Sequence, residues 1–207
     1  MPGASSRPQA GAFTRVDGSF GSFGQGGGGV DLRAGDVFVV AGRGWLSGAI
    51  RFFTRKAGEA PTRASHVGLV VEDGTDPFVI EALGRGVTLR RFSEGPGRGR
   101  HAVYRAGWTP GQIALVVARA TEDVGKPYGY VGIVTSALDW FLNGAYVFRR
   151  LTDKGRTGQF CSWSLWDWCE PPFRDAGLRP FDAPRGCSPD DVDDYVRRRW
   201  ACVREMS

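Results

Sequence analysis

The chain has 207 residues, 42% of them hydrophobic and 12% aromatic, and a net charge of +5. This length and composition predict a single domain with a substantial core. The basic residues are scattered, and no motif for reading a nucleic-acid groove accompanies them, which argues against specific nucleic-acid binding. The four cysteines have no CxxC spacing and only two histidines accompany them, so we expect no metal and no cofactor.

Residues 1–29 differ in composition from the rest of the chain. They are rich in glycine and serine, end in four consecutive glycines and show no apolar periodicity. We expect a flexible tail, whose phenylalanines offer contacts to an assembly partner, and one folded domain over residues 30–207. The first residues lack the basic stretch and the apolar run of a secretory signal. No segment has the roughly 20 apolar residues of a transmembrane helix. We therefore expect a location in the cytoplasm or delivery within a phage or secretion particle.

The first half of the domain is predicted to consist mostly of strands. Short apolar runs bounded by turn residues predict them at 37–40, 65–71, 78–82, 87–92 and 102–105. A short helix over 45–53 and a polar loop over 54–63 separate the first two. Asp73-Gly74 is a favoured two-residue hairpin turn. A hairpin centred on this turn places His66 directly opposite Glu81, with their Cβ atoms about 5 Å apart.

The second half is predicted to be mostly helical. Thr109-Pro110 and Ser188-Pro189 are start signals for two helices, because a hydroxyl that caps the helix precedes a proline at its first position. Two further helices are expected over 130–142 and 161–169, the second ended by Pro171-Pro172. Because strands come first and helices later, we predict an α+β domain with an antiparallel sheet.

Cys161 is the most informative residue of the chain. It follows a polar turn and precedes an apolar stretch with helical spacing, so we expect it at the first turn of a helix. Unsatisfied backbone N–H groups and the helix dipole favour its thiolate, which is the nucleophilic form. The predicted hairpin offers His66 as a base and Glu81 as its partner. Each residue also has an ordinary interpretation, as a packed apolar thiol, a structural histidine and a satisfied ion pair, respectively.

The expected roles of the other polar, aromatic and thiol side chains follow from their sequence context. The residues that we expect to line the substrate cleft are Ser65, Tyr128, Tyr130 and Trp163. For the three tryptophans of the Cys161 helix, core packing is preferred over a substrate or membrane platform. His101 lies beside an arginine-rich loop and is expected at the surface. Buried free thiols are expected at Cys169, Cys187 and Cys202, with disulfide pairing left open.

The order of several short motifs carries a resemblance to a known family. They are Gly35-Asp36 before a strand, Ser65-His66-Val67-Gly68, Ile80-Glu81-Ala82 with Gly86-Val87, Lys126-Pro127-Tyr128, Phe160-Cys161-Ser162 and Ser188-Pro189-Asp190-Asp191. Over residues 31–200 the chain resembles the circularly permuted NlpC-type papain-like cysteine hydrolases, and within them the YiiX-like or YebB-like group. In papain the cysteine helix precedes the histidine strand, whereas the histidine comes first in the permuted group and in this chain.

The resemblance implies a papain-like α+β fold, in which a small antiparallel sheet packs on helices. It also implies a Cys-His-Glu triad, with Cys161 as nucleophile, His66 as general base and Glu81 as the residue that orients His66. The oxyanion would be held by the backbone N–H of Cys161 and by a second donor that the sequence does not identify. The order and spacing of the motifs together match the family, but two features depart from its pattern. The family's enzymes often act on cell-wall peptides outside the cytoplasm, whereas no signal peptide is recognised here, and the Cys161 helix is unusually rich in tryptophan.

Three functions remain open at this point. The first is a cysteine peptidase or amidase, a thiol hydrolase that cleaves amide bonds in peptides, with peptidoglycan stem peptides of the cell wall as the expected substrate. The second is a thiol acyltransferase or lipid hydrolase acting on an acyl or lipid substrate. The third is a non-enzymatic papain-like binding or assembly module in a phage or secretion apparatus. The triad does not separate the first two, because both pass through the same acyl-thioester.

Overall fold

The structure is a computed structural model. It describes residues 31–42, 47–48, 63–98, 100–129, 161–182 and 187–206. The expected tail, the expected helix over 130–142 and nearly all of the expected helix over 45–53 lie outside the described residues. None of the helices in the described part is long and apolar enough to cross a bilayer.

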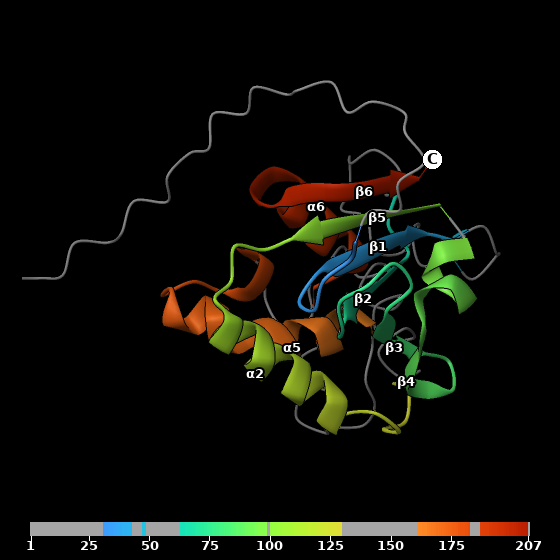
Figure 1. Cartoon of the computed structure of the whole chain (residues 1–207), viewed down its shortest axis with the longest axis horizontal. Helices are drawn as coiled ribbons and strands as arrows, with labels where there is room; N and C mark the ends of the chain where they lie inside the picture. The colour runs from blue at the N-terminus through green and yellow to red at the C-terminus, as the bar shows by residue number, and fades with distance from the viewer. Residues whose placement is uncertain are drawn as a thin grey trace, which may run out of the picture.

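The centre of the described part is an antiparallel sheet (Figure 1). Its strands are β1 (Val37–Ala41), β2 (His66–Val70), β3 (Phe78–Leu83), β4 (Gly86–Arg91), β5 (Arg100–Arg105) and β6 (Ala201–Met206). Their order across the sheet is β4-β3-β2-β1-β5-β6. All five expected strands are confirmed to within about two residues. The sequence analysis missed β6, because this edge strand pairs only with β5 and is largely exposed, so it lacks the apolar pattern of a buried strand.

The β2–β3 pairing corrects one prediction. Leu69 faces Ile80 and Val70 faces Val79, since the connection over residues 71–77 is longer than a two-residue turn and the pairing is centred one residue after Asp73-Gly74. The prediction that His66 lies directly opposite Glu81 is therefore wrong, and the register is moved by two residues. Side chains alternate between the two faces of a strand, so a shift of two leaves both residues on the same face.

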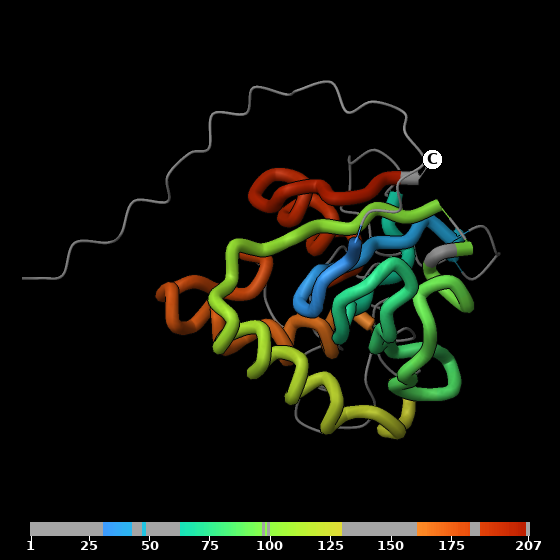
Figure 2. Tube along the Cα trace, in the orientation of Figure 1, coloured from blue at the N-terminus to red at the C-terminus, as the bar shows by residue number. Residues whose placement is uncertain are grey.

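Three α-helices are described, and all are confirmed elements. They are α2 (Pro110–Glu122), α5 (Cys161–Asp175) and α6 (Pro189–Arg199). The hydroxyls of Thr109 and Ser188 each close a capping box, which confirms the two expected helix starts. Single 3-10 turns lie at η1 (Phe92–Glu94), η2 (Pro96–Arg98) and η3 (Pro180–Asp182). The tube in Figure 2 shows α2 and α5 running beside each other along one side of the sheet.

Helix α5 is longer than the sequence suggests. Its predicted end before Pro171-Pro172 is wrong, because the helix continues through both prolines to Asp175. A proline in a helix lacks the N–H that would bond the carbonyl four residues earlier. For Pro171 that carbonyl belongs to Asp167, and Nη1 of Arg119 donates to it at 2.8 Å. A side chain from α2 thus replaces the missing backbone donor, and both prolines are buried.

The sheet is covered on both faces. The larger core joins one face to the helices, and its largest fully buried side chains are Trp168, Tyr104, Leu69, Ile80 and Leu165. The smaller core lies on the other face and consists of Leu32, Phe38, Val70, Val79, Phe92 and Val103. His101 pairs with Val40 in the β1–β5 ladder and its ring centre lies 5.0 Å from that of Phe92. The expectation that His101 is at the surface is wrong, because β5 begins at Arg100 and carries His101 into the sheet.

All four cysteines are free thiols. Cys169 and Cys187 are buried as expected, and burial raises the pKa of the Cys169 thiol, which keeps it protonated and unreactive. Cys202 is exposed, which contradicts its expected burial. The reason is its place on the edge strand β6, which the sequence analysis did not include.

Candidate active site

Cys161 is the first residue of α5, as the sequence predicts. It is 1% exposed and belongs to the larger core. The next residue holds the helix start in place, because Oγ of Ser162 donates to the carbonyl of Cys187 at 2.6 Å. The backbone N–H groups of this first turn have no partner within the helix, so they provide positive potential at the sulfur.

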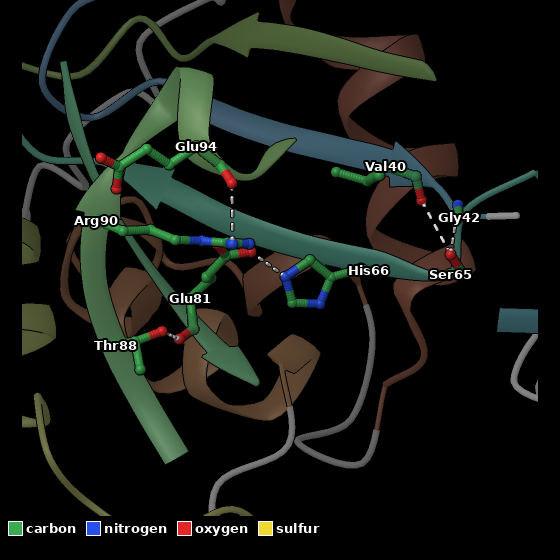
Figure 3. A network of polar contacts seen from close by, with 8 residues as sticks. All are labelled: Val40, Gly42, Ser65, His66, Glu81, Thr88, Arg90 and Glu94. Carbon is green, nitrogen blue, oxygen red and sulfur yellow. Dashed lines mark hydrogen bonds and ion pairs between the residues drawn. The ribbon is translucent and has the colours of Figure 1, made fainter. Parts of the chain in front are cut away.

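His66 is the first residue of β2, and its ring is bonded to the carboxylate of Glu81 (Figure 3). Nε2 of His66 donates to Oε2 of Glu81 at 2.5 Å. The ring's other nitrogen points away from the carboxylate in Figure 3. It is the one left to interact with Cys161, whose hydrogen bond and charge contribute to the raised pKa of His66. The His66 side chain is 19% exposed, so the ring remains reachable from solvent.

The surroundings of His66 favour its charged form. Burial lowers the pKa of the imidazole, but the hydrogen bond and charge of Cys161, followed by those of Glu81, raise it to about 10. The ordinary pKa is 6.5, so these neighbours favour the imidazolium over the neutral ring. A basic ring beside a cysteine at a helix start is the general setting of a nucleophilic cysteine.

Glu81 lies in the middle of β3 and is 1% exposed. Burial raises the pKa of its carboxyl, but the hydrogen bond and charge of His66 and then those of Arg90 outweigh burial and hold the pKa below its ordinary value. Nε of Arg90 donates to Oε1, the oxygen that His66 does not use. The buried carboxylate is therefore ionised and accepts from a different side chain at each oxygen, as a buried charge requires.

Arg90 is the residue of this site that the sequence analysis missed. Gly84-Arg85 forms the two-residue turn between β3 and β4, and Glu81 pairs with Thr88 in that ladder. Arg90 lies two residues further along β4, which makes it the diagonal same-face neighbour of Glu81. Counting residues across the β3–β4 turn would have predicted from the sequence that Arg90 lies beside Glu81.

The expected substrate-binding residues lie in different surroundings. Ser65 is buried, and its hydroxyl donates to the carbonyl of Val40 at 3.2 Å and accepts from the N–H of Gly42 at 2.8 Å. These bonds fasten the start of β2 to the end of β1, directly before His66. Tyr128 and Trp163 are partly buried against the larger core. Tyr130 lies outside the described residues, and a role in substrate binding remains a prediction for all four.

The other tryptophans of α5 serve the core. Trp168 is 1% exposed, and its Nε1–H donates to Oδ2 of Asp123 at 2.8 Å. Trp166 is partly buried and packs against the same core as Trp163. This placement fits the expected packing role, which joins α5 to the end of α2 and fixes the helix that carries Cys161.

Comparison with known proteins bears on the fold. No model of a protein family matches the chain. No curated protein matches it either. Among solved structures, the crystal structure of the metalloprotein YiiX from Escherichia coli O157:H7 is similar, with a TM-score of 0.54 at 18% sequence identity, over 84% of this chain and 97% of that one. At this identity the likeness shows the fold alone. The chain has a YiiX-like fold, and its small antiparallel sheet packed on helices is the expected papain-like α+β arrangement.

Proposed function

We propose that the chain is a cysteine hydrolase of the permuted NlpC-type, which cleaves an amide bond through an acyl-enzyme on Cys161. One observation carries the proposal. Nε2 of His66 is bonded to a buried, ionised carboxylate, and Cys161 at the start of α5 acts on the same ring strongly enough to raise its pKa. Nucleophile, base and orienting residue in this order are the parts of a cysteine acyl-transfer site.

In the first half of the reaction the Cys161 thiolate attacks the carbonyl carbon of the amide. The developing oxyanion lies near the first turn of α5, where the backbone N–H of Cys161 is a natural donor. The His66 imidazolium then gives its proton to the leaving amine, the C–N bond breaks, and the acyl group remains on sulfur. His66 is neutral at this stage.

In the second half neutral His66 acts as base for water. It takes a proton from the water that attacks the thioester, and the acid leaves as the C–S bond breaks. Glu81 accepts the Nε2–H throughout, which keeps the other ring nitrogen available to the reacting groups. Peptides, and peptidoglycan stem peptides in particular, are the substrate class that we propose.

A metal has no part in this proposal, although the similar structure is titled a metalloprotein. Within the described residues, no three His, Cys, Asp or Glu side chains are arranged to hold a metal ion. Nε2 of His66 is bonded to Glu81, and Cys161 raises the pKa of the same ring. This donor set fits a thiolate–imidazolium pair better than a metal.

The proposal is tested by the rate of Cys161 alkylation by iodoacetamide between about pH 4 and 9, in the wild type and in His66→Ala. Modified peptides should be resolved by mass spectrometry, because Cys202 is exposed and reacts with iodoacetamide as well. Cys202 serves as the internal control, since partial desolvation and the nearby Glu205 carboxylate raise the pKa of its thiol. We expect Cys161 to react below pH 7 and to lose that reactivity in His66→Ala.

A Cys161 that reacts only near the free-thiol pKa of about 8.5, and equally in both proteins, would overturn the proposal. If Cys161 shows this His66-dependent reactivity, the next step is to assay candidate substrates. Release of free amine from muropeptides supports the amidase, whereas release of fatty acid from lipid without any amine release would contradict it. Cys161→Ala is the matched control for both assays, and its activity should be lower by about 10³-fold or more.

A further inference from the structure

We propose that Arg90 is a positioning residue of the site, which holds the Glu81 carboxylate in place so that Glu81 can hold His66 against Cys161. This inference rests on the proposed function. It adds a fourth member, on β4, to the expected Cys-His-Glu triad and gives that member a task during turnover.

The contacts define a chain of side chains across neighbouring strands and the helix start. Nε of Arg90 donates to Oε1 of Glu81, and Nε2 of His66 donates to Oε2. A carboxylate with a fixed donor at each oxygen cannot rotate about its terminal bond without breaking one of them. Arg90 therefore fixes the plane of the carboxylate, and the plane fixes the position of the imidazole.

The guanidinium of Arg90 is itself held in place by its surroundings. Its Nη1 donates to the carbonyl of Glu94 at 3.4 Å, as Figure 3 shows. The guanidinium also lies against Gly95, where an added Cβ would come within 2.1 Å of the Arg90 Cζ. Glycine at this position leaves the space that the guanidinium occupies. The side chain is 24% exposed, so it is packed along the site and does not extend freely into solvent.

The charge of Arg90 matters most when His66 is neutral. Once His66 has given its proton to the leaving group, it no longer supplies a positive charge to Glu81. A buried carboxylate with only neutral partners takes up a proton readily. Protonated Glu81 would donate to Nε2, which would place the imidazole proton on the nitrogen that must act as base. An arginine remains charged at every working pH, so Arg90 keeps Glu81 an acceptor through the second half of the reaction.

The groups around Glu81 make this a two-cation arrangement. The titratable side chains that act on it are His66 from β2 and Arg90 from β4, and Cys161 from α5 acts through His66. The hydroxyl of Thr88 reaches only the main-chain carbonyl of Glu81, at 3.4 Å. With His66 neutral, the guanidinium is thus the cation that still contacts the carboxylate among these groups.

The test uses the full-length protein with p-nitrophenyl acetate as substrate. The initial burst of p-nitrophenol reports acylation of the enzyme, and the steady-state rate of its release that follows reports deacylation. The variants are Arg90→Met, Arg90→Lys and Gly95→Ala. The matched control is Arg91→Met, because Arg91 is the next residue of β4 and instead pairs with Glu72, where both side chains are nearly half exposed. Circular dichroism and melting temperature establish that each variant is folded.

We expect the acid limb of the steady-state rate to move to higher pH by about 1 to 3 units in Arg90→Met, the range by which a neighbouring cation shifts a carboxyl pKa. Gly95→Ala should shift it in the same direction, since its Cβ displaces the guanidinium without removing a charge. Arg90→Lys should restore part of the shift, because the charge returns but the fork geometry does not. Arg91→Met should keep the wild-type profile.

The outcomes separate this inference from the proposed function. A wild type without a Cys161-dependent burst, equal to Cys161→Ala, overturns the proposed function and the inference with it. A wild type that shows the burst, together with folded Arg90→Met or Gly95→Ala of unchanged pH profile, overturns the inference alone. If Arg90→Met does not fold, Gly95→Ala and Arg90→Lys decide by the same criterion.

Discussion

Replacement of Glu81 by glutamine tests how strongly the buried carboxylate holds the site together. The carboxylate accepts from His66 at one oxygen and Arg90 at the other. Glutamine keeps the shape but presents an NH2 group to one of these donors, so one cation loses its acceptor. Breaking a buried ion pair costs about 3–5 kcal/mol. Because the side chains of His66 and Arg90 are 19% and 24% exposed, water recovers part of this, and we expect Glu81→Gln to lower the free energy of unfolding by about 2–3 kcal/mol.

This loss of stability has a definite dependence on pH. The folded pKa of Glu81 lies below its ordinary value of 4.5, mainly because His66 and Arg90 outweigh the effect of burial. A carboxyl group of this kind contributes its stability fully above the unfolded pKa and loses it as the pH falls toward the folded pKa. The advantage of the wild type over Glu81→Gln should therefore be largest near pH 6 and shrink as the pH falls from 4.5 toward the folded pKa, by at most about 1.4 kcal/mol for each pH unit in that interval.

Urea unfolding, followed by tryptophan fluorescence at about pH 6 and about pH 3.5, measures both quantities when the slope with denaturant is unchanged. The matched control is Glu72→Gln, whose carboxylate pairs with Arg91 where the side chains are 45% and 43% exposed. Such a surface pair is worth about 0–1 kcal/mol. The reasoning fails if Glu81→Gln is as stable as Glu72→Gln near pH 6, or if its deficit is the same at both pH values.

Two further substitutions test the packing that supports the site. Gly68→Ala should lower the melting temperature and reduce the free energy of unfolding by about 1–3 kcal/mol, because the added Cβ would lie 2.3 Å from the ring of Phe38. A melting temperature equal to that of the wild type would show that the ring has room to move. Trp168→Phe should lower the urea midpoint and reduce the free energy of unfolding by about 1–3 kcal/mol, because the buried Asp123 carboxylate loses the Nε1–H donor that lies 2.8 Å away. An unchanged midpoint would contradict a structural role for that hydrogen bond.

The parts of the fold that follow from local chemistry were predictable. Apolar runs between turn residues predicted five strands, and a hydroxyl before a proline predicted the starts of α2 and α6. The same reasoning failed where a distant residue decides the local structure. Helix α5 passes through Pro171-Pro172 because Arg119 of α2 supplies a donor to Asp167. No local pattern around the prolines contains that information.

The candidate site was predictable to the extent that it depends on strand alternation. The wrong register between β2 and β3 still kept His66 and Glu81 on one face, because the error was an even number of residues. An error of one residue would have separated them across the sheet. The same parity places Arg90 beside Glu81 from the β3–β4 hairpin, so all three side chains follow from two turns and a period of two. Cys161 is different, because no ladder joins α5 to β2. Its contact with His66 depends on how α5 packs on the larger core, and only the resemblance of the ordered motifs anticipated it.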